Sequence, residues 1–436
     1  MKYFKIITLG CKVNQCESAY LAEELERTGW TPAPSVDIAK LCIINTCTVT
    51  GKAAMQSRQE LRRIIRQTKN ALVIATGCYA QTSPDDIASI PGVAYVIGNS
   101  NKVDIPRLAD NSIPIPAPNV CVPELRPNTI FQDMPAFNFS KRTRAFLKIQ
   151  DGCDASCSYC IVPKARGGIR SLPFATALEH IQSLVAFGYR EIVLTGIHLG
   201  KYGVDISPQT RLLQLLKEIE KSSSPVRIRI SSIEPAEISK ELIDLIAHSS
   251  KICHHLHIPL QSGDDNILKR MNRSYSASYF EEIIQEIAKK IPDINIGCDI
   301  LVGFPGETET CFRNTLSIIK RLPIAYLHIF PFSRRADTAA YSYPDQLHPK
   351  IIKKRCDALK QIDMQKRFVF YSRFIGQSTP LLIERERGTP ARRLKGLTGN
   401  YIPVLIEGEI KEKNNFINVT LTMVEGGKVT GYPSIS

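Results

Sequence analysis

Three closely spaced cysteines constrain this chain more than any other feature, because their side chains have to meet at one point in the fold. They are Cys153, Cys157 and Cys160, in the segment Asp-Gly-Cys-Asp-Ala-Ser-Cys-Ser-Tyr-Cys. Thiolates at this C-x3-C-x2-C spacing can hold one face of a [4Fe-4S] cluster and leave its fourth iron without a protein ligand. A thioredoxin-like pair at Cys157 and Cys160 is the simpler alternative, but it leaves Cys153 unexplained. The spacing therefore predicts a cluster with one open iron.

This segment resembles the radical S-adenosylmethionine superfamily. In that superfamily the open iron binds the amine and carboxylate of S-adenosylmethionine, and the reduced cluster splits this cofactor to give a 5′-deoxyadenosyl radical. Tyr159 stands at the aromatic position before the third cysteine, where the superfamily packs the adenine moiety. The resemblance implies that Tyr159 contributes to a cofactor site.

The composition indicates a globular protein with an anionic partner. The chain has 436 residues, 43% of them hydrophobic, which is enough for two to four domains with cores of their own. Its 56 Lys and Arg against 42 Asp and Glu give a net charge of +14, which favours a polyanion such as RNA. No apolar run approaches the roughly 18 residues that span a bilayer, and the run before Cys11 is too short for a lipoprotein signal. Because the number of cysteines is odd, we expect reduced thiols in a cytoplasmic protein without a membrane partner.

Strand-like and helical segments alternate in the first part of the chain. The expected strands are 3–9, 41–45, 71–75 and 95–97, and the expected helices are 17–27 and 53–67. Alternation at about 30 residues per unit predicts a parallel sheet with helices on both faces.

A second set of cysteines follows the first three of these strands. Cys11, Cys47 and Cys78 each come just after a strand end, and in a parallel sheet all the carboxyl ends lie on one edge, where such folds bind ligands. Three converging thiolates suggest a second iron-sulfur site, again one ligand short of four. The alternative is three buried cysteines that act as small hydrophobic side chains.

Residues beside these cysteines suit a bulky inorganic group. Gly10 and Gly77 directly precede two of the cysteines and would let the backbone approach a cluster closely. Asn14, Asn45 and Thr46 could donate hydrogen bonds to its sulfides, which would tune the reduction potential.

The two cysteine triads together resemble the methylthiotransferases, radical enzymes with an amino-terminal triad, a central catalytic barrel and a carboxyl-terminal TRAM domain. Residues 8–15, Thr-Leu-Gly-Cys-Lys-Val-Asn-Gln, resemble the branch that acts on N6-threonylcarbamoyladenosine at position 37 of tRNA. The resemblance implies replacement of the adenine C2–H by SCH3, with two [4Fe-4S] clusters and S-adenosylmethionine as cofactors. The amino-terminal cluster would carry or supply the methylated sulfur. The implied partners are tRNA, an external one-electron reductant and a sulfur source.

Other functions remain open at this point. The isopentenyladenosine branch usually has a Tyr-Gly-Cys-Gln-Met-Asn type motif, and the branch that modifies a ribosomal-protein aspartate has a Leu-Gly-Cys-Pro-Lys-Asn type motif. An alternative of another class is a non-catalytic iron-sulfur protein that binds RNA. The sequence identifies no catalytic residue.

The chain divides into four parts. We expect an α/β domain at 1–110, a proline-rich linker at 111–139, a radical domain at 140–375 and a TRAM domain at 376–436. Strands at 145–150, 191–194, 226–230, 255–258, 294–301 and 325–330 predict a partial (β/α)6 barrel. Strands at 379–384, 394–398, 401–406, 409–413 and 416–424 predict a small antiparallel barrel of the kind that binds RNA.

Polar and glycine residues follow the expected barrel strands, where ligands bind. By resemblance, Gly196, Ser232, Glu234 and Gln261 hold S-adenosylmethionine; the alternative for each is a barrel turn or a capping group. The Gly-x-x-Gly at 303–306 lacks the lysine of a phosphate loop.

Other candidate residues are basic. No carboxylate is expected to pair with His255 or His257, so we predict no zinc there. The helical segment 350–373 carries eight Lys or Arg against two Asp and could contact phosphates or form a solvated face. The threonylcarbamoyl group adds a carboxylate to the base, and Lys12, Arg166 and Arg170 are the candidates for recognising it.

Overall fold

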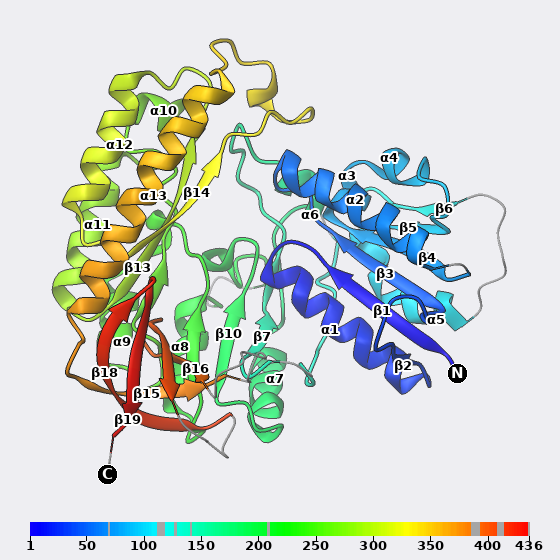
Figure 1. Ribbon diagram of the computed structural model, residues 1–436, viewed down its shortest axis with the longest axis horizontal. Helices are drawn as coiled ribbons and strands as arrows, with labels where there is room; N and C mark the ends of the chain where they lie inside the picture. Colours follow the sequence, from blue (N-terminus) through cyan, green and yellow to red (C-terminus); the bar gives the residue numbers. More distant parts are fainter. Residues whose placement is uncertain are drawn as a thin grey trace.

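The computed structural model describes residues 1–68, 70–110, 118–125, 129–139, 142–206, 210–384, 393–407 and 414–434. It consists of an amino-terminal α/β unit, a central open barrel and a small carboxyl-terminal barrel beneath the central one (Figure 1). The mixed α/β class predicted from the sequence is confirmed. None of the described helices is both long and apolar enough to cross a bilayer.

The amino-terminal unit is a six-stranded parallel sheet in the order β2-β1-β3-β4-β5-β6. Its strands are β1 (Tyr3–Thr8), β2 (Thr31–Pro32), β3 (Leu41–Thr46), β4 (Leu72–Gly77), β5 (Tyr95–Ile97) and β6 (Asn119–Cys121). Helices α1 (Lys12–Arg27) and α5 (Ile105–Asp110) cover one face; α2 (Gly51–Gln67), α3 (Cys78–Thr82) and α4 (Pro84–Ala88) cover the other.

Local sequence explains the limits of these elements. Every residue of β3 is buried, as expected for a short apolar run at the centre of a parallel sheet. Thr50 caps α2 by accepting a hydrogen bond from the Ala53 N–H. Gly29 has a φ of +86° just after α1, a conformation that ends helices.

The proline-rich segment is not a simple linker. Residues 119–121 form β6, which pairs in parallel with β5 through Tyr95 and Asn119, so part of this segment belongs to the amino-terminal sheet. No sequence pattern predicted this strand, since its three residues are exposed at the sheet edge and lie between prolines.

The central barrel has six parallel strands in two sheets. They are β7 (Ala145–Lys148), β10 (Glu191–Thr195), β11 (Arg227–Ile230), β12 (His255–His257), β13 (Asn295–Val302) and β14 (Tyr326–Pro331). Single bridges between Ile228 and Ile252 and between Ser232 and His257 join the two sheets. All six were expected from the sequence, and the partial (β/α)6 barrel is confirmed.

Helices form the outer layer of this barrel (Figure 1). They are α7 (Phe174–Ala186), α8 (Leu212–Lys221), α9 (Lys240–His248), α10 (Asp265–Arg270), α11 (Ala277–Lys290), α12 (Glu309–Arg321) and α13 (Pro349–Ser372). The short strands β8 (Gln150–Asp151) and β9 (Arg170–Ser171) pair with each other, with α6 (Val162–Arg166) between them.

The carboxyl-terminal barrel is closed in the order β15-β16-β17-β19-β18. Its strands are β15 (Ser378–Ile383), β16 (Arg393–Thr398), β17 (Pro403–Glu407), β18 (Phe416–Glu425) and β19 (Lys428–Pro433). The sequence analysis missed β19, which closes the barrel by pairing in parallel with β17, whereas the other pairs are antiparallel. The strand expected at 409–413 lies outside the described residues.

A buried charge cluster joins the two barrels. Glu191 accepts hydrogen bonds from Arg227 Nε at 2.6 Å and Arg229 Nε at 2.8 Å. The same arginines donate to backbone oxygens of the small barrel, Arg227 to Leu397 at 2.9 Å and Arg229 to Gly399 at 3.0 Å. Tyr401 lies under the Arg229 guanidinium. Fixed charges at the base of the central barrel therefore set the position of the carboxyl-terminal one.

We predict that Glu191→Gln lowers the free energy of unfolding by about 3–5 kcal/mol at neutral pH, because it leaves two buried arginines without a carboxylate. Burial alone would raise the pKa of Glu191, but Arg229 and Arg227 lower it from 4.5 to about 2. Its stabilisation is therefore complete above pH 4.5 and is lost as the pH falls towards 2. Denaturant titrations of both proteins across this range measure the difference.

The matched control is Glu218→Gln. Glu218 pairs with Lys221 on the surface of α8, and exposed pairs contribute about 0–1 kcal/mol. Equal losses for the two variants would show that the Glu191 cluster does not stabilise the fold.

Candidate active site between the two cysteine triads

The amino-terminal cysteines lie at one edge of the parallel sheet. Cys11 precedes α1, Cys47 follows β3, and Cys78 is the first residue of α3 after β4. Each is within electrostatic range of the others, and burial raises the pKa of Cys47 to about 11. Cys47 and Cys78 are buried, whereas Cys11 is exposed. A metal ion deprotonates its thiol ligands. The all-sulfur donor set suits an iron-sulfur cluster.

Gly10 and Gly77 serve this edge differently from the expectation. A Cβ on Gly10 would lie 2.8 Å from Cys47 Sγ, and one on Gly77 would lie 2.4 Å from the Thr46 carbonyl oxygen. Both glycines also have positive φ. They allow the cysteine-bearing loops to approach one another, so the close contact is with the protein's own chain.

The expectation that Asn14, Asn45 and Thr46 donate hydrogen bonds to cluster sulfides is wrong, because these side chains donate to backbone carbonyls. Asn14 Nδ2 donates to the carbonyls of Leu9 at 2.7 Å and Thr46 at 3.0 Å. Asn45 Nδ2 donates to the Asn14 carbonyl at 3.0 Å, and the Thr46 hydroxyl donates to Thr76. These side chains satisfy buried backbone groups and tie the strand ends together.

The second triad lies in the loop between β8 and α6. The Cys153 N–H donates to the Gly167 carbonyl at 2.9 Å, and the Cys160 N–H donates to the Cys157 carbonyl at 3.1 Å. The three sulfurs lie within electrostatic range of each other. Ser158 fixes the loop, because its hydroxyl donates to the Arg270 carbonyl at 2.8 Å. The loop presents three thiols in a frame that can hold one cluster.

Two side chains that the sequence analysis missed contact this triad. His198 Nδ1 lies 3.3 Å from Cys153 Sγ, and its Nε2 lies 2.6 Å from Glu237. Arg273 Nη1 lies 3.3 Å from Cys157 Sγ and also forms an ion pair with Glu234. His198 follows β10, where polar residues were expected to bind ligands, but nothing in the sequence marked Arg273, because it lies in a turn after α10.

The residues expected to hold S-adenosylmethionine lie at the carboxyl ends of the barrel strands, on the side of this triad. Tyr159 packs edge-on against Phe304, with ring centroids 6.4 Å apart. Ser232 and Gln261 lie at strand ends and form bridges to neighbouring strands. Glu234 pairs with Arg273. A Cβ on Gly196 would lie 2.8 Å from Gln150 Oε1, so this glycine admits a side chain of the protein itself.

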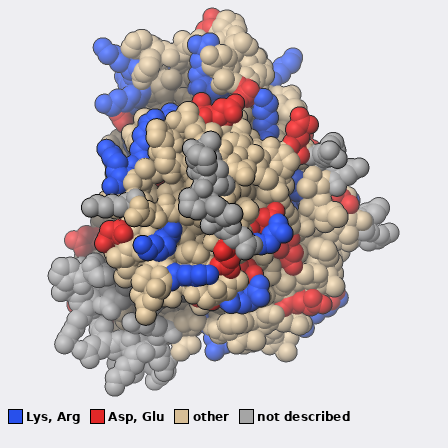
Figure 2. Space-filling view, turned by 90° about the vertical axis from the view of Figure 1, so that its right-hand side faces the viewer, with Lys and Arg blue, Asp and Glu red and all other residues tan. Residues whose placement is uncertain are grey.

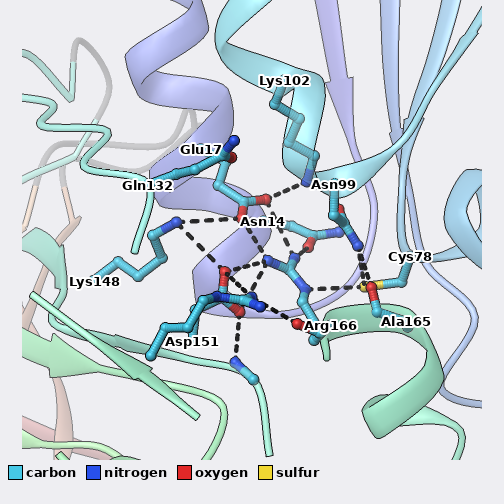
Figure 3. Close-up of polar contacts among 12 residues, drawn as sticks. Asn14, Glu17, Cys78, Asn99, Lys102, Gln132, Lys148, Asp151, Ala165 and Arg166 are labelled. Atoms are coloured by element: carbon cyan, nitrogen blue, oxygen red, sulfur yellow. Dashed lines mark hydrogen bonds and ion pairs between the residues drawn. The ribbon is translucent and has the colours of Figure 1, made fainter. Parts of the chain in front are cut away.

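A buried ionic network connects the two triads (Figure 3). Arg166 is completely buried, and its Nε lies 3.3 Å from Cys78 Sγ. Its Nη1 forms ion pairs with Glu17 of α1 and with Asp151, which precedes Cys153 by two residues. One guanidinium thus touches a cysteine of the amino-terminal unit and the base of the other cysteine loop.

Lysines complete this network. Lys102 forms a fully buried ion pair with Glu17, and Lys148 lies 3.6 Å from both Glu17 and Asp151. Burial would raise the pKa of Glu17, but Arg166 and the lysines hold it well below its usual range. Both carboxylates therefore remain ionised, and the network pairs charges from two parts of the chain.

The network removes two of the three candidates for recognising a substrate carboxylate. Arg166 is occupied as described, and Arg170 Nη2 donates to the Arg166 carbonyl at 2.6 Å and lies 3.7 Å from Asp151. Lys12 remains, because among the described residues no hydrogen bond or ion pair holds it. Burial lowers the pKa of Lys12, and Tyr401, Arg144, Arg229 and Glu191 at the base of the central barrel have smaller effects on it.

One further expectation is corrected by a contact between strands, whereas the Gly-x-x-Gly turn at 303–306 agrees with its lack of a phosphate-loop lysine. His257 Nε2 lies 2.7 Å from Asp299, so a carboxylate does pair with one of the histidines. Pairing across β12 and β13 brings together residues that are far apart in sequence. At 303–306, the Gly303 N–H donates to Glu307, which pairs with Arg355. That turn is filled by the chain itself.

Comparison with known families matches two parts of this chain. Residues 147–319 match the model of the radical SAM superfamily, and residues 3–98 match the model described as Uncharacterized protein family UPF0004. Each match contains one cysteine triad.

Relatives extend over nearly the whole chain. It is 37% identical over 404 residues to the threonylcarbamoyladenosine tRNA methylthiotransferase MtaB of Bacillus subtilis, covering 92% of this chain and 89% of the relative. It is 30% identical over 427 residues to the tRNA-2-methylthio-N(6)-dimethylallyladenosine synthase of Carboxydothermus hydrogenoformans, covering 97% of each. The radical S-adenosylmethionine methyltransferase TsrM of Kitasatospora setae shares the fold, with a TM-score of 0.57, 16% identity and coverage of 78% and 77%.

We predict that Arg166→Gln destabilises the cluster-free protein by about 3–5 kcal/mol, because Glu17 and Asp151 stay buried with less opposing charge. Arg166→Lys keeps the charge but loses the forked geometry, so its loss should be smaller. Denaturant unfolding measures both variants. Lys164→Ala is the control, since Lys164 pairs with Asp337 on the surface and should cost about 0–1 kcal/mol. A loss for Arg166→Gln no larger than that of the control would contradict the role of the network.

Proposed function

This chain belongs to the threonylcarbamoyladenosine tRNA methylthiotransferase family, and we propose that it converts N6-threonylcarbamoyladenosine at position 37 of tRNA into its 2-methylthio derivative. The observation that carries this proposal is the short connection between the two cysteine triads. Arg166 contacts Cys78 directly and reaches the Cys153 loop through Asp151. One substrate base between these triads could approach both sites.

The cofactors are S-adenosylmethionine and two [4Fe-4S] clusters. The proposed ligands of the amino-terminal cluster are Cys11, Cys47 and Cys78, and those of the barrel cluster are Cys153, Cys157 and Cys160. When bound, these groups supply a carbon radical and a methylated sulfur, chemistry that an adenine C–H without an acidic proton requires. We assign Tyr159, Gly196, Ser232, Glu234 and Gln261 to the S-adenosylmethionine site.

Side chains of the protein orient this site. Arg273 bridges Glu234 and Cys157. The Glu234 carboxylate, which we assign to the cofactor site, and the proposed cluster ligand Cys157 therefore share one cation. The His198 N–H of the backbone donates to Gln150 Oε1 at 2.7 Å, which fixes the loop after β10 against β8. Held this way, the groups lose little conformational freedom when the cofactors bind.

Lys12 is the proposed partner of the threonylcarbamoyl carboxylate. It is half-buried at the start of α1, beside Cys11, and burial lowers its pKa. A cation in this setting favours an anionic ligand, whereas an isopentenyl group would leave it unpaired.

The RNA partner fits the surface charge. Figure 2 shows Lys and Arg side chains gathered in the upper part of one face, with Asp and Glu scattered among them. On α13, Lys350, Lys353 and Lys354 are exposed, whereas Arg355 is buried against Glu307. We propose that the first turns of α13 and the carboxyl-terminal barrel share the phosphate contacts.

Several further expectations accompany this function. We propose the expected division into an α/β domain, a linker, a radical domain at 140–375 and a TRAM domain at 376–436, with the first boundary moved from 110 to a point beyond β6. The reaction needs an external one-electron reductant and a sulfur source. We place the protein in the cytoplasm, where its tRNA substrate is found, without a membrane partner.

Replacing each triad separately tests the cluster assignment. Changing Cys153, Cys157 and Cys160 to Ala should leave about half of the iron and abolish cleavage of S-adenosylmethionine. Changing Cys11, Cys47 and Cys78 to Ala should also halve the iron, while cleavage persists without thiolated product. Cys121→Ala and Cys253→Ala are controls and should keep all the iron. Full iron in either triple variant would show that the corresponding site does not exist.

Nucleoside analysis of cellular tRNA tests the substrate. Deleting the gene should remove 2-methylthio-N6-threonylcarbamoyladenosine and leave its precursor, with the 2-methylthio-isopentenyl nucleoside unchanged. Lys12→Gln should restore cluster content but only about a tenth or less of the product, because its neutral side chain cannot pair with the carboxylate. Loss of the isopentenyl product would instead identify the other branch. Full product formation by Lys12→Gln would exclude Lys12 as the recognising group.

A further inference from the structure

Strand β14 exposes two aromatic rings inside a barrel whose strands are otherwise mostly buried. The side chain of His328 is 52% exposed, and Phe330 is 40% exposed. Alternation along the strand places both on the same side as Tyr326, which is buried. The two rings meet edge to face, with centroids 6.4 Å apart. An exposed histidine and phenylalanine thus form one continuous aromatic surface.

This surface lies next to the proposed S-adenosylmethionine site. His328 pairs with Asp299 of β13, and Phe330 pairs with Leu301. The backbone of Gln261 bonds to both of these β13 residues, through its N–H to the Asp299 carbonyl and its carbonyl to the Leu301 N–H. A ligand on the rings would therefore lie beside a residue assigned to the cofactor.

The carboxyl end of β14, next to Phe330, leads to the amino-terminal triad. Ser333 follows the strand and accepts a hydrogen bond from the Gly51 N–H at 2.8 Å, and Arg335 donates to the Thr48 hydroxyl. Thr48 directly follows Cys47. The strand thus runs between the loops of the two triads.

Polar contacts fix the orientation of His328. Its Nδ1 lies 3.4 Å from Asp299 Oδ1, which also contacts His257 Nε2 at 2.7 Å. His257 Nδ1 in turn lies 3.1 Å from the Tyr326 hydroxyl. Burial would raise the pKa of Asp299, but its hydrogen bonds with His257 and His328 hold it well below its usual range. The carboxylate anchors one edge of the His328 ring and leaves the other edge free.

We propose that His328 and Phe330 form the platform on which the target adenine base stacks during the reaction. Enzymes that modify a base must take it out of its stack, and proteins hold unstacked RNA bases on aromatic side chains, including Phe and His. Asp299 and His257 are positioning residues in this arrangement. The inference rests on the proposed function, because it places the base of that substrate.

A metal ion is the alternative ligand for the same group. One donor atom each from His257, Asp299 and His328 lies within 4.8 Å of the others, which would suit two histidines and a carboxylate around a divalent ion. Stacking is favoured because the metal interpretation gives no role to Phe330, and because Asp299 already bonds to His257.

The experiment compares the affinity of the full chain for an RNA that carries the target base with its affinity for an RNA that lacks this base. An anticodon stem-loop carrying N6-threonylcarbamoyladenosine is compared with the same RNA carrying an abasic residue at that position. The wild type should bind the first RNA about 5- to 150-fold more tightly, the range that base–aromatic stacking provides. Phe330→Ala and His328→Ala should lose most of this preference, whereas Phe330→Trp should keep it.

Controls separate stacking from folding. Phe187→Ala removes a ring that is 64% exposed outside the barrel interior and should keep the preference. All variants should retain their iron, and Phe187→Ala should also cleave S-adenosylmethionine without RNA as the wild type does. A wild-type preference in both alanine variants would overturn the proposal. The proposal would also be overturned if the wild type held a zinc or iron ion in addition to the two clusters and His328→Ala lost that ion. This result would indicate a metal site instead.

The same proteins distinguish this inference from the proposed function. If the wild type forms no 2-methylthio product, the function is wrong. If the product forms and Phe330→Ala forms it with unchanged kcat and KM, the function stands and the platform is wrong.

Discussion

The structure depends on one buried guanidinium. Arg166 lies between two parts of the chain that could each fold around its own core, and it satisfies Glu17, Asp151 and Cys78 at once. A buried cation is costly unless it is fully paired. The pairing requires the edge of the amino-terminal sheet and the Cys153 loop to be present together. The relative position of the two cysteine triads is therefore set by charge as well as by apolar packing.

Charge has the same role at the opposite end of the central barrel. Arg229 is buried between Glu191 and the backbone of the small barrel, and Arg355 is buried against Glu307. Several of the cations that give the chain its net charge of +14 thus lie inside, paired with acids. These paired cations are not available to bind RNA. The exposed lysines at the start of α13 therefore contribute more to RNA binding than the total number of basic residues on that helix suggests.

The sequence allowed the cysteines to be placed because they follow strands whose carboxyl ends share one sheet edge by topology. It also allowed the six central strands to be placed, since apolar runs between helices have clear limits. It could not predict β6, whose three residues are exposed, or β19, in which only Val429 is buried; both strands form by pairing with a neighbouring strand. The glycine and asparagine residues beside the cysteines were interpreted wrongly. A glycine shows that something approaches the backbone closely, and an asparagine shows that a donor is present, but neither identifies the partner, which here is the protein's own chain. Arg166 was assigned to the substrate carboxylate and Asp299 was not assigned at all, because their actual partners lie far away in sequence.

The pairing of β6 with β5 has a consequence for the connection between the two cysteine-bearing parts. Residues 122–144 join the sheet edge to β7, and the described part of this connection is packed against the protein, because Met134, Ala136 and Phe139 are buried. The Phe139 N–H also donates to the Tyr189 hydroxyl at 2.8 Å. Separation of the two parts would therefore expose these apolar side chains to water, which costs free energy.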